Sequence, residues 1–473
     1  MKTSYSSFYF LLFSLVVGLA ACRVGRNYER PPVALPQQFN NNTAPSDTSS
    51  IAEIEWKKFF TDATLQQLID KAVTGNYDLQ LAVKRVESAQ AYLKQAKVAW
   101  LPAFNATASA STNFPSKNSF NGLNLSVNNL GDHIEDFNLG VGMSWEIDIW
   151  GKIRRQQEAA LATYLQSYEG EHAVQTGLVA AVATSYFNLL MLDNQLSIAR
   201  RNLSLSDTIV KMIRLQKAAG EVTELGVQQA ISQQQTAELL IPQLEQGIAI
   251  QENALRILMG ELPSTITRES KLADFKVTDS LPTGIPATMI SRRPDVRASE
   301  MGLVAANAQV GVAQGSMYPT LTITASGGVN AFKASNWFNL PASLFGTVAG
   351  GLTQPIFQRR QLKTQLEVAK IQREQAVIQF KQSALNAIGE VSDALVKLDK
   401  VKVQQEIALR QVNTSQLAVQ QAQMLFRSGM ANYLEVITAQ SRSLQAELAQ
   451  ADIDRQRLSA MVDLYRSLGG GWK

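Results

Sequence analysis

A large part of this sequence occurs twice, and this internal duplication constrains the fold more strongly than any other feature. Residues 76–109 align without a gap with residues 293–326, at an offset of 217, so that Pro102 pairs with Pro319. Repeats of this length are typical of a supersecondary unit that a chain builds more than once. We therefore expect two copies of one structural plan.

A second pair of blocks repeats farther along the chain, at a different offset. Gly220 pairs with Gly429, and Gly260 pairs with Gly469, both at an offset of 209. The first copy therefore carries eight extra residues, the difference between the two offsets. We place them within residues 102–150, which include a stretch rich in serine, asparagine and glycine.

Long proline-free stretches in each copy predict helices of unusual length. All 14 prolines lie at or before Pro355, and none lies between Pro115 and Pro242. Residues 153–219 and 357–428 are rich in amino acids that favour uninterrupted helix. Such a helix extends roughly 100 Å at 1.5 Å per residue, which is too long for a compact domain. We expect a coiled or tubular array of long helices.

We expect two strands in each copy, between the proline and the long helix, and three segments show or approach the alternation of β-strands. From Phe137 to Ile147, apolar residues alternate strictly with polar residues, glycine or Glu146. Residues 320–325 alternate in the same way in the second copy, and the segment at 345–352 is less regular. The pattern fits an ordinary half-buried sheet and equally fits membrane strands with lipid on one face.

Four strands per chain limit how such strands could lie in a membrane. Open strand edges are not tolerated in hydrocarbon, and two hairpins cannot close a barrel alone. Several chains must then share one barrel, and three chains would supply twelve strands, an even number as in outer-membrane barrels.

The N-terminal segment ends at the only cysteine of the chain. Lys2 and the apolar run 8–19 have the layout of a secretory signal peptide. The run ends in Leu19-Ala20-Ala21-Cys22, which resembles a bacterial lipobox, so we predict lipidation at Cys22. Several acyl chains, at about 0.8 kcal/mol per buried CH₂, anchor a protein firmly. A plain signal peptide with an incidental cysteine is the alternative. Arg23 replaces the aspartate that would retain a lipoprotein at the inner membrane, which favours the outer membrane.

Composition argues against several classes of function. The 44 basic and 40 acidic residues give a net charge of +4, too balanced to suggest a nucleic-acid partner. One cysteine permits no intramolecular disulfide and no thiolate metal cluster, and the two histidines, His133 and His172, stand in different contexts. We therefore predict no enzyme, no metal and no cofactor beyond the covalent N-acyl and S-diacylglycerol lipid on Cys22. We also see no apolar run after residue 22 that is long enough for a membrane helix.

Several motifs, in order along the chain, resemble those of TolC-type outer-membrane efflux channels, in the lipoprotein branch that serves resistance-nodulation-division pumps. The resemblance covers residues 19–473, although the family usually has proline where Arg26 stands. The motifs are the lipobox followed by residues 24–31, WEIDIWGK at 145–152, SRRPDVRASE at 291–300, LTQPIF at 352–357 and LYRSLGGGW at 464–472.

The resemblance implies a fold class, a domain organisation and a function. The fold is mainly α with a small β part: long helical hairpins form a periplasmic tunnel, and two β-hairpins per chain complete a 12-stranded barrel in a homotrimer. The protein would passively conduct solutes outward, with a periplasmic adaptor (membrane fusion) protein, an inner-membrane pump of the same class and outer-membrane lipid as partners. The expected segments are the signal peptide 1–21, the lipidated equatorial segment 22–60, the first helix 61–101, barrel hairpin 102–150 and helical hairpin 151–260 of repeat 1, the equatorial connection 261–290, the first helix 291–318, barrel hairpin 319–356 and helical hairpin 357–469 of repeat 2, and the tail 470–473.

The two turns between long helices are the predicted periplasmic tip of the tunnel. Glycine at a helix C-terminus accepts the left-handed conformation that ends a helix, and a cation in the last turn is favoured by the helix dipole. From the residues alone these are αα-turns. The resemblance implies that they also contact the adaptor, so the predicted contact residues are Gly220, Gly429, Lys217, Arg427, Leu215 and Leu434.

One residue near the second turn is a candidate for a pore constriction. The family often has acidic residues six and nine positions after the turn glycine, and here these positions hold Glu435 and Thr438. Only Glu435 could then form a ring of three carboxylates, whose mutual repulsion would raise their pKa values and attract cations. The equivalent position in the first copy is Gly226. The alternative is a solvated glutamate at a helix start, favoured by the dipole.

Two other classes of function compete with the channel. A periplasmic lipoprotein spacer or adaptor without a pore would explain Cys22 and the helices, but not the repeated alternating hairpin. An enzyme would have to use acidic residues such as Asp132, Glu135 and Asp136, which fit a solvated loop better. The cargo stays open among drug, metal, other solute and polypeptide.

Overall fold

The computed structural model describes residues 24–32, 50–127, 131–275 and 286–473, and its chain divides into two compact units. Unit 1 comprises residues up to 31 together with 87–165 and 301–378, and unit 2 comprises the remainder. Each unit is described on its own. Cys22 lies outside the described residues, so its predicted lipidation is not addressed by the structure.

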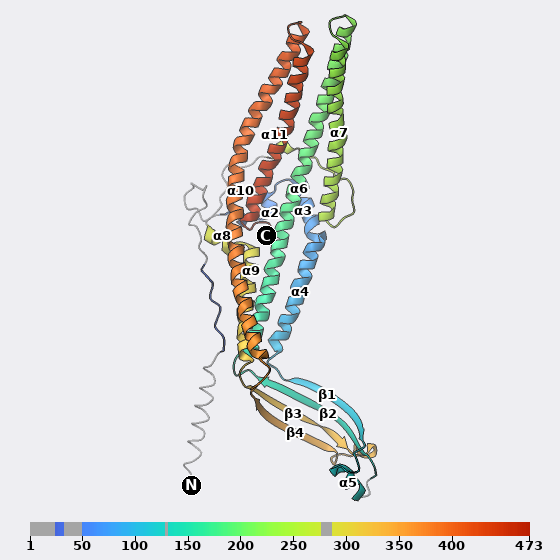
Figure 1. Cartoon of the computed structure of the whole chain (residues 1–473), viewed down its shortest axis with the longest axis vertical. Coiled ribbons are helices and arrows are strands. Elements are labelled where there is room, and N and C mark those ends of the chain that lie inside the picture. The colour runs from blue at the N-terminus through green and yellow to red at the C-terminus, as the bar shows by residue number, and fades with distance from the viewer. Residues whose placement is uncertain (1–23, 33–49, 128–130, 276–285) are drawn as a thin grey trace. The chain divides into compact units, whose positions relative to one another are not determined.

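The described part of the chain consists mainly of helices, with four strands (Figure 1). The α-helices are α2 (Trp56–Phe59), α3 (Ala63–Gly75), α4 (Tyr77–Val98), α5 (Phe120–Val127), α6 (Lys152–Ala218), α7 (Glu224–Leu258), α8 (Pro286–Arg292), α9 (Pro294–Gly315), α10 (Gln361–Arg427) and α11 (Tyr433–Ser467). The strands are β1 (Ala103–Asn113), β2 (Ile134–Ile147), β3 (Thr320–Ala331) and β4 (Leu344–Thr353), and short 3-10 turns lie at Ile51–Glu53 (η1), Leu272–Asp274 (η2) and Ala334–Asn336 (η3).

The duplication predicted from the sequence is confirmed element by element. Helices α4 and α9 both have 22 residues and start 217 positions apart. Helices α6 and α10 both have 67 residues, and α7 and α11 both have 35, each pair starting 209 positions apart. The offset therefore changes between the first helix and the long helix of each copy, as predicted, and α5 is an element of this longer connection in the first copy.

The two 67-residue helices confirm the long helices that the proline distribution predicted. Gly170 and Gly177 lie inside α6, which runs without a break from Lys152 to Ala218. The second long helix begins at Gln361 rather than at residue 357, because Arg359 and Arg360 just before it have φ angles of 48° and 68°. Residues in this left-handed region do not belong to a right-handed helix.

Helix α6 requires a correction to the sequence-based view that no apolar run after residue 22 could span a membrane. Within the described residues, α6 contains an 18-residue window with a mean hydropathy of 1.3, which passes a test of length and composition. More than half of this window, 56%, is buried inside the chain. Such burial is typical of a core helix in a protein, because a lipid-facing helix keeps its apolar side chains uncovered.

The four strands form one antiparallel sheet in unit 1, in the order β1-β2-β3-β4. Consecutive strands pair along nearly their whole length, for example Ala103 with Ser144 and Thr320 with Thr353. The central β2–β3 pairing joins the hairpin of the first copy to that of the second. Strands β1 and β4 are the two edges, and neither has a second strand partner in the sheet that the structure describes.

In unit 2 the C-terminal end of α11 packs against the segment near residue 55. The ring of Tyr465 stacks on Phe59 at 4.0 Å between centroids, and its hydroxyl donates to the carbonyl of Ile54 at 2.6 Å. The backbone N–H of Trp56 also donates to the carbonyl of Lys473, at 3.3 Å. These contacts join the described start of unit 2 to its end.

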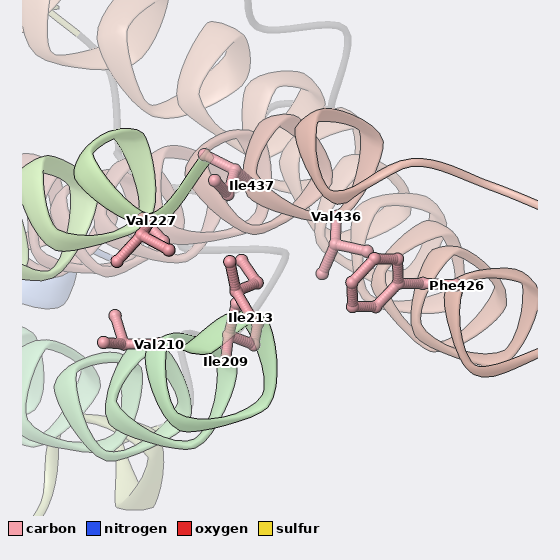
Figure 2. Close-up of a cluster of buried hydrophobic side chains, with 8 residues drawn as sticks. Ile209, Val210, Ile213, Val227, Phe426, Val436 and Ile437 are labelled. Atoms are coloured by element: carbon pink, nitrogen blue, oxygen red, sulfur yellow. The ribbon is translucent and has the colours of Figure 1, made fainter. Parts of the chain in front are cut away.

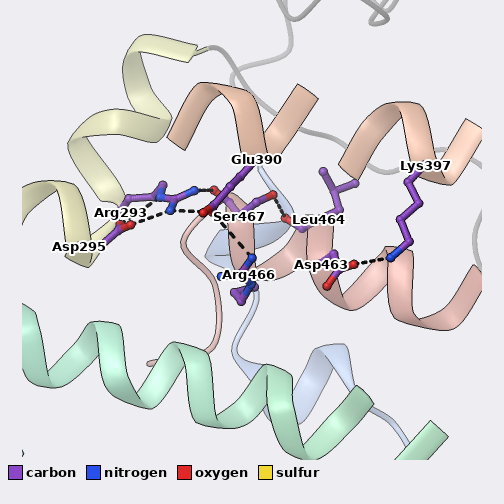
Figure 3. A network of polar contacts seen from close by, with 8 residues as sticks. All are labelled: Arg293, Asp295, Glu390, Lys397, Asp463, Leu464, Arg466 and Ser467. Carbon is purple, nitrogen blue, oxygen red and sulfur yellow. Dashed lines mark hydrogen bonds and ion pairs between the residues drawn. The ribbon is translucent and has the colours of Figure 1, made fainter. Parts of the chain in front are cut away.

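A buried arginine ties the start of α9 to the end of α11, as Figure 3 shows. Arg293 is 5% exposed and donates to the carbonyl of Ser467 at 2.8 Å and to the carboxylates of Asp295 and Glu390 at 2.6 and 2.9 Å. Burial alone would raise the pKa of Asp295, but its bonds to Arg293 outweigh this and lower the pKa. The SRRPDVRASE motif therefore supplies a structural ion cluster.

Candidate functional site

The two turns that the sequence analysis placed at the tip share one backbone motif. Gly220 and Gly429 have φ angles of 84° and 75°, and a Cβ on either would meet no atom within 4 Å. The N–H of Glu221 donates to the carbonyl of Gln216, and that of Met430 donates to Leu425, both at 2.9 Å. This is the bonding of a Schellman motif, so glycine is needed here for its left-handed conformation and not for space.

The predicted cations lie in the last helical turns, as expected. Lys217 is in the last turn of α6 and forms an exposed ion pair with Glu224 at the start of α7. Arg427 is the last residue of α10 and is exposed. An exposed pair contributes little stability, so Lys217 and Glu224 mainly set the charge pattern of the turn.

Large apolar side chains around the two turns are uncovered. Leu215 is 72% exposed and Leu434 is 51% exposed, and both were predicted contact residues. Three further apolar side chains near the turns are more than 60% exposed: Leu225, Met424 and Met430. Exposed apolar side chains that gather in one place mark interaction surfaces, whereas scattered ones do not.

Beneath the turns, one apolar cluster joins the ends of all four long helices (Figure 2). Helix α6 contributes Ile213, which is fully buried, and α11 contributes Val436, which is also fully buried. The other members are Ile209, Val210, Val227, Ala230, Phe426 and Ile437. The cluster fixes the two helical hairpins to each other near their turns.

A contact between the two hairpins explains the glycine that stands where the second copy has Glu435. A Cβ on Gly226 would lie 2.9 Å from the ring of Tyr433, closer than real Cβ contacts allow. The Tyr433 hydroxyl donates to the side-chain carbonyl of Gln229 at 2.8 Å. The sequence analysis did not predict this contact. The alignment of Gly226 with Glu435 in the repeat was a sign that another residue approaches the backbone closely at Gly226.

Glu435 itself is exposed and lines a groove of about 1150 Å³ between α10 and α11. Its backbone N–H donates to the side-chain carbonyl of Asn432, the N-cap of α11, at 3.2 Å. Thr438 lines the same groove, so the sixth and ninth positions after Gly429 do share a face. Arg410 and Arg442 also line it, so two cations share the groove with the carboxylate.

One face of the sheet in unit 1 consists only of apolar residues and glycine. This face comprises alternate residues of β2 from Phe137 to Ile147 and the residues of the other strands that are in register with them. The strand register brings these positions together across all four strands. They are Phe104, Ala106, Ala108, Ala110, Phe137, Leu139, Val141, Met143, Trp145, Ile147, Leu321, Ile323, Ala325, Gly327, Val329, Ala331, Leu344, Gly346, Val348, Gly350 and Leu352. Several are strongly exposed, such as Val348 at 81% and Phe104 at 66%.

The opposite face of the sheet is polar. Its residues are mainly threonine, serine, asparagine and glycine, with Glu146 near the end of β2. Phe345 is an exception, and its ring lies 3.3 Å from where a Cβ of Gly140 would be. One uncovered apolar face and one polar face in an antiparallel sheet fit strands between lipid and a water-filled lumen.

Aromatic residues gather at both ends of the apolar face. At the end where the strands join the helices, Trp145 donates to the carbonyl of Trp100 at 2.8 Å, and Trp150 stacks on Tyr318 at 5.0 Å. We call this set, with Phe104, the helix-end girdle. At the opposite end, the ring of Trp337 packs on Phe137 at 5.6 Å and on Phe338 at 5.1 Å. Paired aromatic girdles flank the apolar band of membrane barrels.

The acidic residues that an enzyme would have had to use lie at or just before the start of strand β2, next to His133. Asp132 bonds His133 at 2.8 Å, and Glu135 and Asp136 lie in strand β2 rather than in the solvated loop that we expected. The bond to Asp132 raises the pKa of His133. Within the described residues, no group of three or more acidic, histidine or cysteine side chains could hold a metal ion.

Comparison with known proteins finds similarity along the whole chain. Residues 68–261 and 285–470 match the family model "Outer membrane efflux protein". The chain is 30% identical to the toluene efflux pump outer membrane protein TtgF of Pseudomonas putida (all of this chain, 98% of TtgF) and 28% identical to the probable outer membrane lipoprotein SilC of Salmonella typhimurium (98% of each). The open-state structure of the Neisseria gonorrhoeae MtrE outer membrane channel superposes with a TM-score of 0.86, at 26% identity, over 96% of this chain and 99% of that one.

Proposed function

This chain belongs to the outer membrane efflux protein family and is an outer-membrane channel of a Gram-negative efflux system, and we propose that it works as a lipid-anchored homotrimer. It is a transport protein and not an enzyme. In the proposed assembly three copies bring twelve strands to one barrel, and their helical hairpins form one tunnel.

The observation that carries the shared barrel is the sheet, which has one uncovered apolar face and two edges that no further strand pairs with in the part of the chain that the structure describes. Strands β1 and β4 are these edges. In hydrocarbon, every backbone N–H and C=O needs a partner, because no water is available to replace it. Pairing β4 of one copy with β1 of the next removes both edges and leaves the polar face toward the lumen.

An exposed apolar stripe on α10 supports contact between copies along the tunnel. Val396, Val403, Leu417 and Met424 are 41, 47, 53 and 69% exposed and lie at seven-residue spacing, with Arg410 at the position between Val403 and Leu417. Apolar residues at seven-residue spacing form the seam of packed helices in coiled coils. The helices of a neighbouring copy are the partner that we propose for this stripe.

We further propose that the tip is the surface on which a periplasmic adaptor docks, with an inner-membrane pump of the resistance-nodulation-division class behind it. The uncovered apolar residues around Gly220 and Gly429, with Lys217 and Arg427 beside them, support this role. The family membership supports the pump as partner.

The assembly is tested by the mass of the purified protein in mild detergent. We expect three copies of one chain, because the sheet edges need partners from other copies. A stable monomer that still forms channels in lipid bilayers would contradict the shared barrel.

Lipidation at Cys22 is tested by mass spectrometry of the mature N-terminus. The lipobox and the similarity to a probable outer membrane lipoprotein support an acylated Cys22 as the first residue. We expect thioether-linked diacylglycerol and an N-acyl chain on this residue. An unmodified N-terminus, or cleavage at another bond, would rule out the lipid anchor.

A further inference from the structure

The residues that directly follow the predicted lipidation site are held in a closely fitted position in unit 1. Val24 is 8% exposed, and its N–H donates to the carbonyl of Trp150 at 3.3 Å. Gly25 has a φ of 88°, and a Cβ on it would lie 2.9 Å from the Cα of Gly311 in α9. The backbone of this segment therefore touches the backbone of α9.

Arg155, in the first turn of α6, is the centre of this contact. Its side chain is 9% exposed and donates to the carbonyl of Gly25 at 2.9 Å and to the side-chain carbonyl of Asn27 at 3.0 Å. Its charge is paired with Glu158 at 2.6 Å. A buried guanidinium with its donors directed at carbonyls holds a segment of backbone in one position, since its planar fork is rigid.

Helix α9 provides the second side of the contact. Asn307 is 5% exposed and donates to the carbonyl of Arg26 at 3.1 Å. Gly311 leaves room for Arg155, because a Cβ there would lie 2.9 Å from the Cγ of the arginine. We call the site formed by Trp150, Arg155, Asn307 and Gly311 the Arg155 socket.

The socket lies at the end of the sheet where the strands join the helices. Trp150 belongs to the helix-end girdle, and its indole N–H donates to the carbonyl of Pro319, the residue before β3, at 2.7 Å. Trp150, just after β2, is therefore hydrogen-bonded both to Val24 and to Pro319, just before β3.

We propose that the Arg155 socket is the positioning site for the lipid anchor, which it holds at the level of the helix-end girdle. Cys22 lies two positions before Val24, with only Arg23 between them, so the two residues are at most about 7 Å apart. The acyl chains must then enter the membrane beside this girdle, at the depth where aromatic side chains sit. The proposal rests on the proposed lipidation and membrane location, but the socket itself is a property of described residues and can be tested separately.

The socket is tested by trypsin cleavage after Arg26 in the intact, detergent-solubilised protein, with cleavage located by mass spectrometry. Arg26 is exposed, but its backbone is bonded, so the wild-type bond should be cut slowly. Arg155→Met removes hydrogen bonds from a charged group to the segment, and Gly25→Ala disrupts the close backbone contact with Gly311. Each variant should speed cleavage by about tenfold or more. Hydrogen exchange of the peptide that contains Val24 should accelerate in parallel.

Matched variants separate the socket from general strain and from the lipid. Gly131→Ala adds the same backbone strain at a φ of 91° where no atom lies within 4 Å, and it should leave cleavage after Arg26 unchanged. A Cys22→Ser chain exported behind a cleavable signal peptide should also keep Arg26 protected. Loss of protection in Cys22→Ser equal to that in Arg155→Met would show that the lipid holds the segment, and unchanged cleavage in both socket variants would overturn the proposal. Neither result depends on whether mass spectrometry finds the lipid.

Discussion

At the scale of single residues, the two copies of the repeat have diverged where they face each other. Gly226 and Glu435 occupy equivalent positions, but Gly226 lies against the ring of Tyr433 whereas Glu435 lies in an open groove. The turn glycines, by contrast, are kept in both copies, since both helices end in the same left-handed conformation. The two copies therefore share the backbone conformation of their turns but differ in the side-chain contacts at equivalent positions.

The tight contact at Gly226 predicts a sharp response to one methyl group. Gly226→Ala places a Cβ 2.9 Å from Tyr433 and 2.7 Å from Val222, so the hairpins must separate locally at a cost of about 1–3 kcal/mol. The measurement is hydrogen exchange of the peptides covering the two turns. Gly170→Ala, inside α6 with no neighbour, is the control and should leave that exchange as it is. Equal exchange in the two variants would contradict the contact.

At the scale of elements, alternate residues of each strand belong to the apolar face and to the polar face of the sheet. Strand β4 illustrates this, because Val348 belongs to the apolar face and Thr347 to the polar face. The register assigns the faces, and a shift by one residue would exchange them. The short, exposed strand β4 therefore depends on its pairing with β3 for its orientation.

Charges placed on adjacent residues of β4 should have opposite consequences. Val348→Arg puts a guanidinium on the face proposed to contact lipid, where it costs about 2–4 kcal/mol near the middle of a bilayer. Thr347→Arg puts the same group on the polar face and should be tolerated. The measurement is the amount of folded, heat-modifiable oligomer in the outer membrane. A similar loss for both variants would contradict the assignment of the faces.

At the scale of the whole molecule, the selectivity of the channel depends on which groups line its narrowest part. Three copies of Glu435 would bring three carboxylates toward one axis if the groove between α10 and α11 faces the lumen. Arg410 and Arg442 line that groove and would offset part of the negative charge. Position 438, which is threonine, adds no second ring of charge.

Single-channel conductance in planar bilayers tests the role of Glu435. If this carboxylate lines the constriction, Glu435→Gln should lower cation selectivity and weaken block by multivalent cations, since a negative ring attracts them. Glu238→Gln, which removes an exposed carboxylate from α7, is the control. Unchanged selectivity and block in an intact oligomer would leave Glu435 as a surface charge and place the constriction elsewhere.

The sequence by itself determined the elements of this protein, because their signals are local or periodic. Proline distribution predicted long helices over 153–219 and 357–428, close to the observed α6 and α10, the offsets of 217 and 209 predicted the duplication, and strict alternation predicted β2. The turn at Gly220 was predictable for the same reason, since a left-handed residue at a helix end requires glycine.

Only the tertiary structure decided which residues meet across distant parts of the chain. Gly226 against Tyr433, and Arg155 around the backbone of Gly25, join positions far apart in the sequence. Such contacts depend on the rotation of each helix about its axis and on the register of neighbouring elements, and periodicity fixes which face is apolar but not which residue it will face. The lone cysteine was visible in the sequence, whereas the site that holds the residues after it exists only once α6 and α9 are folded.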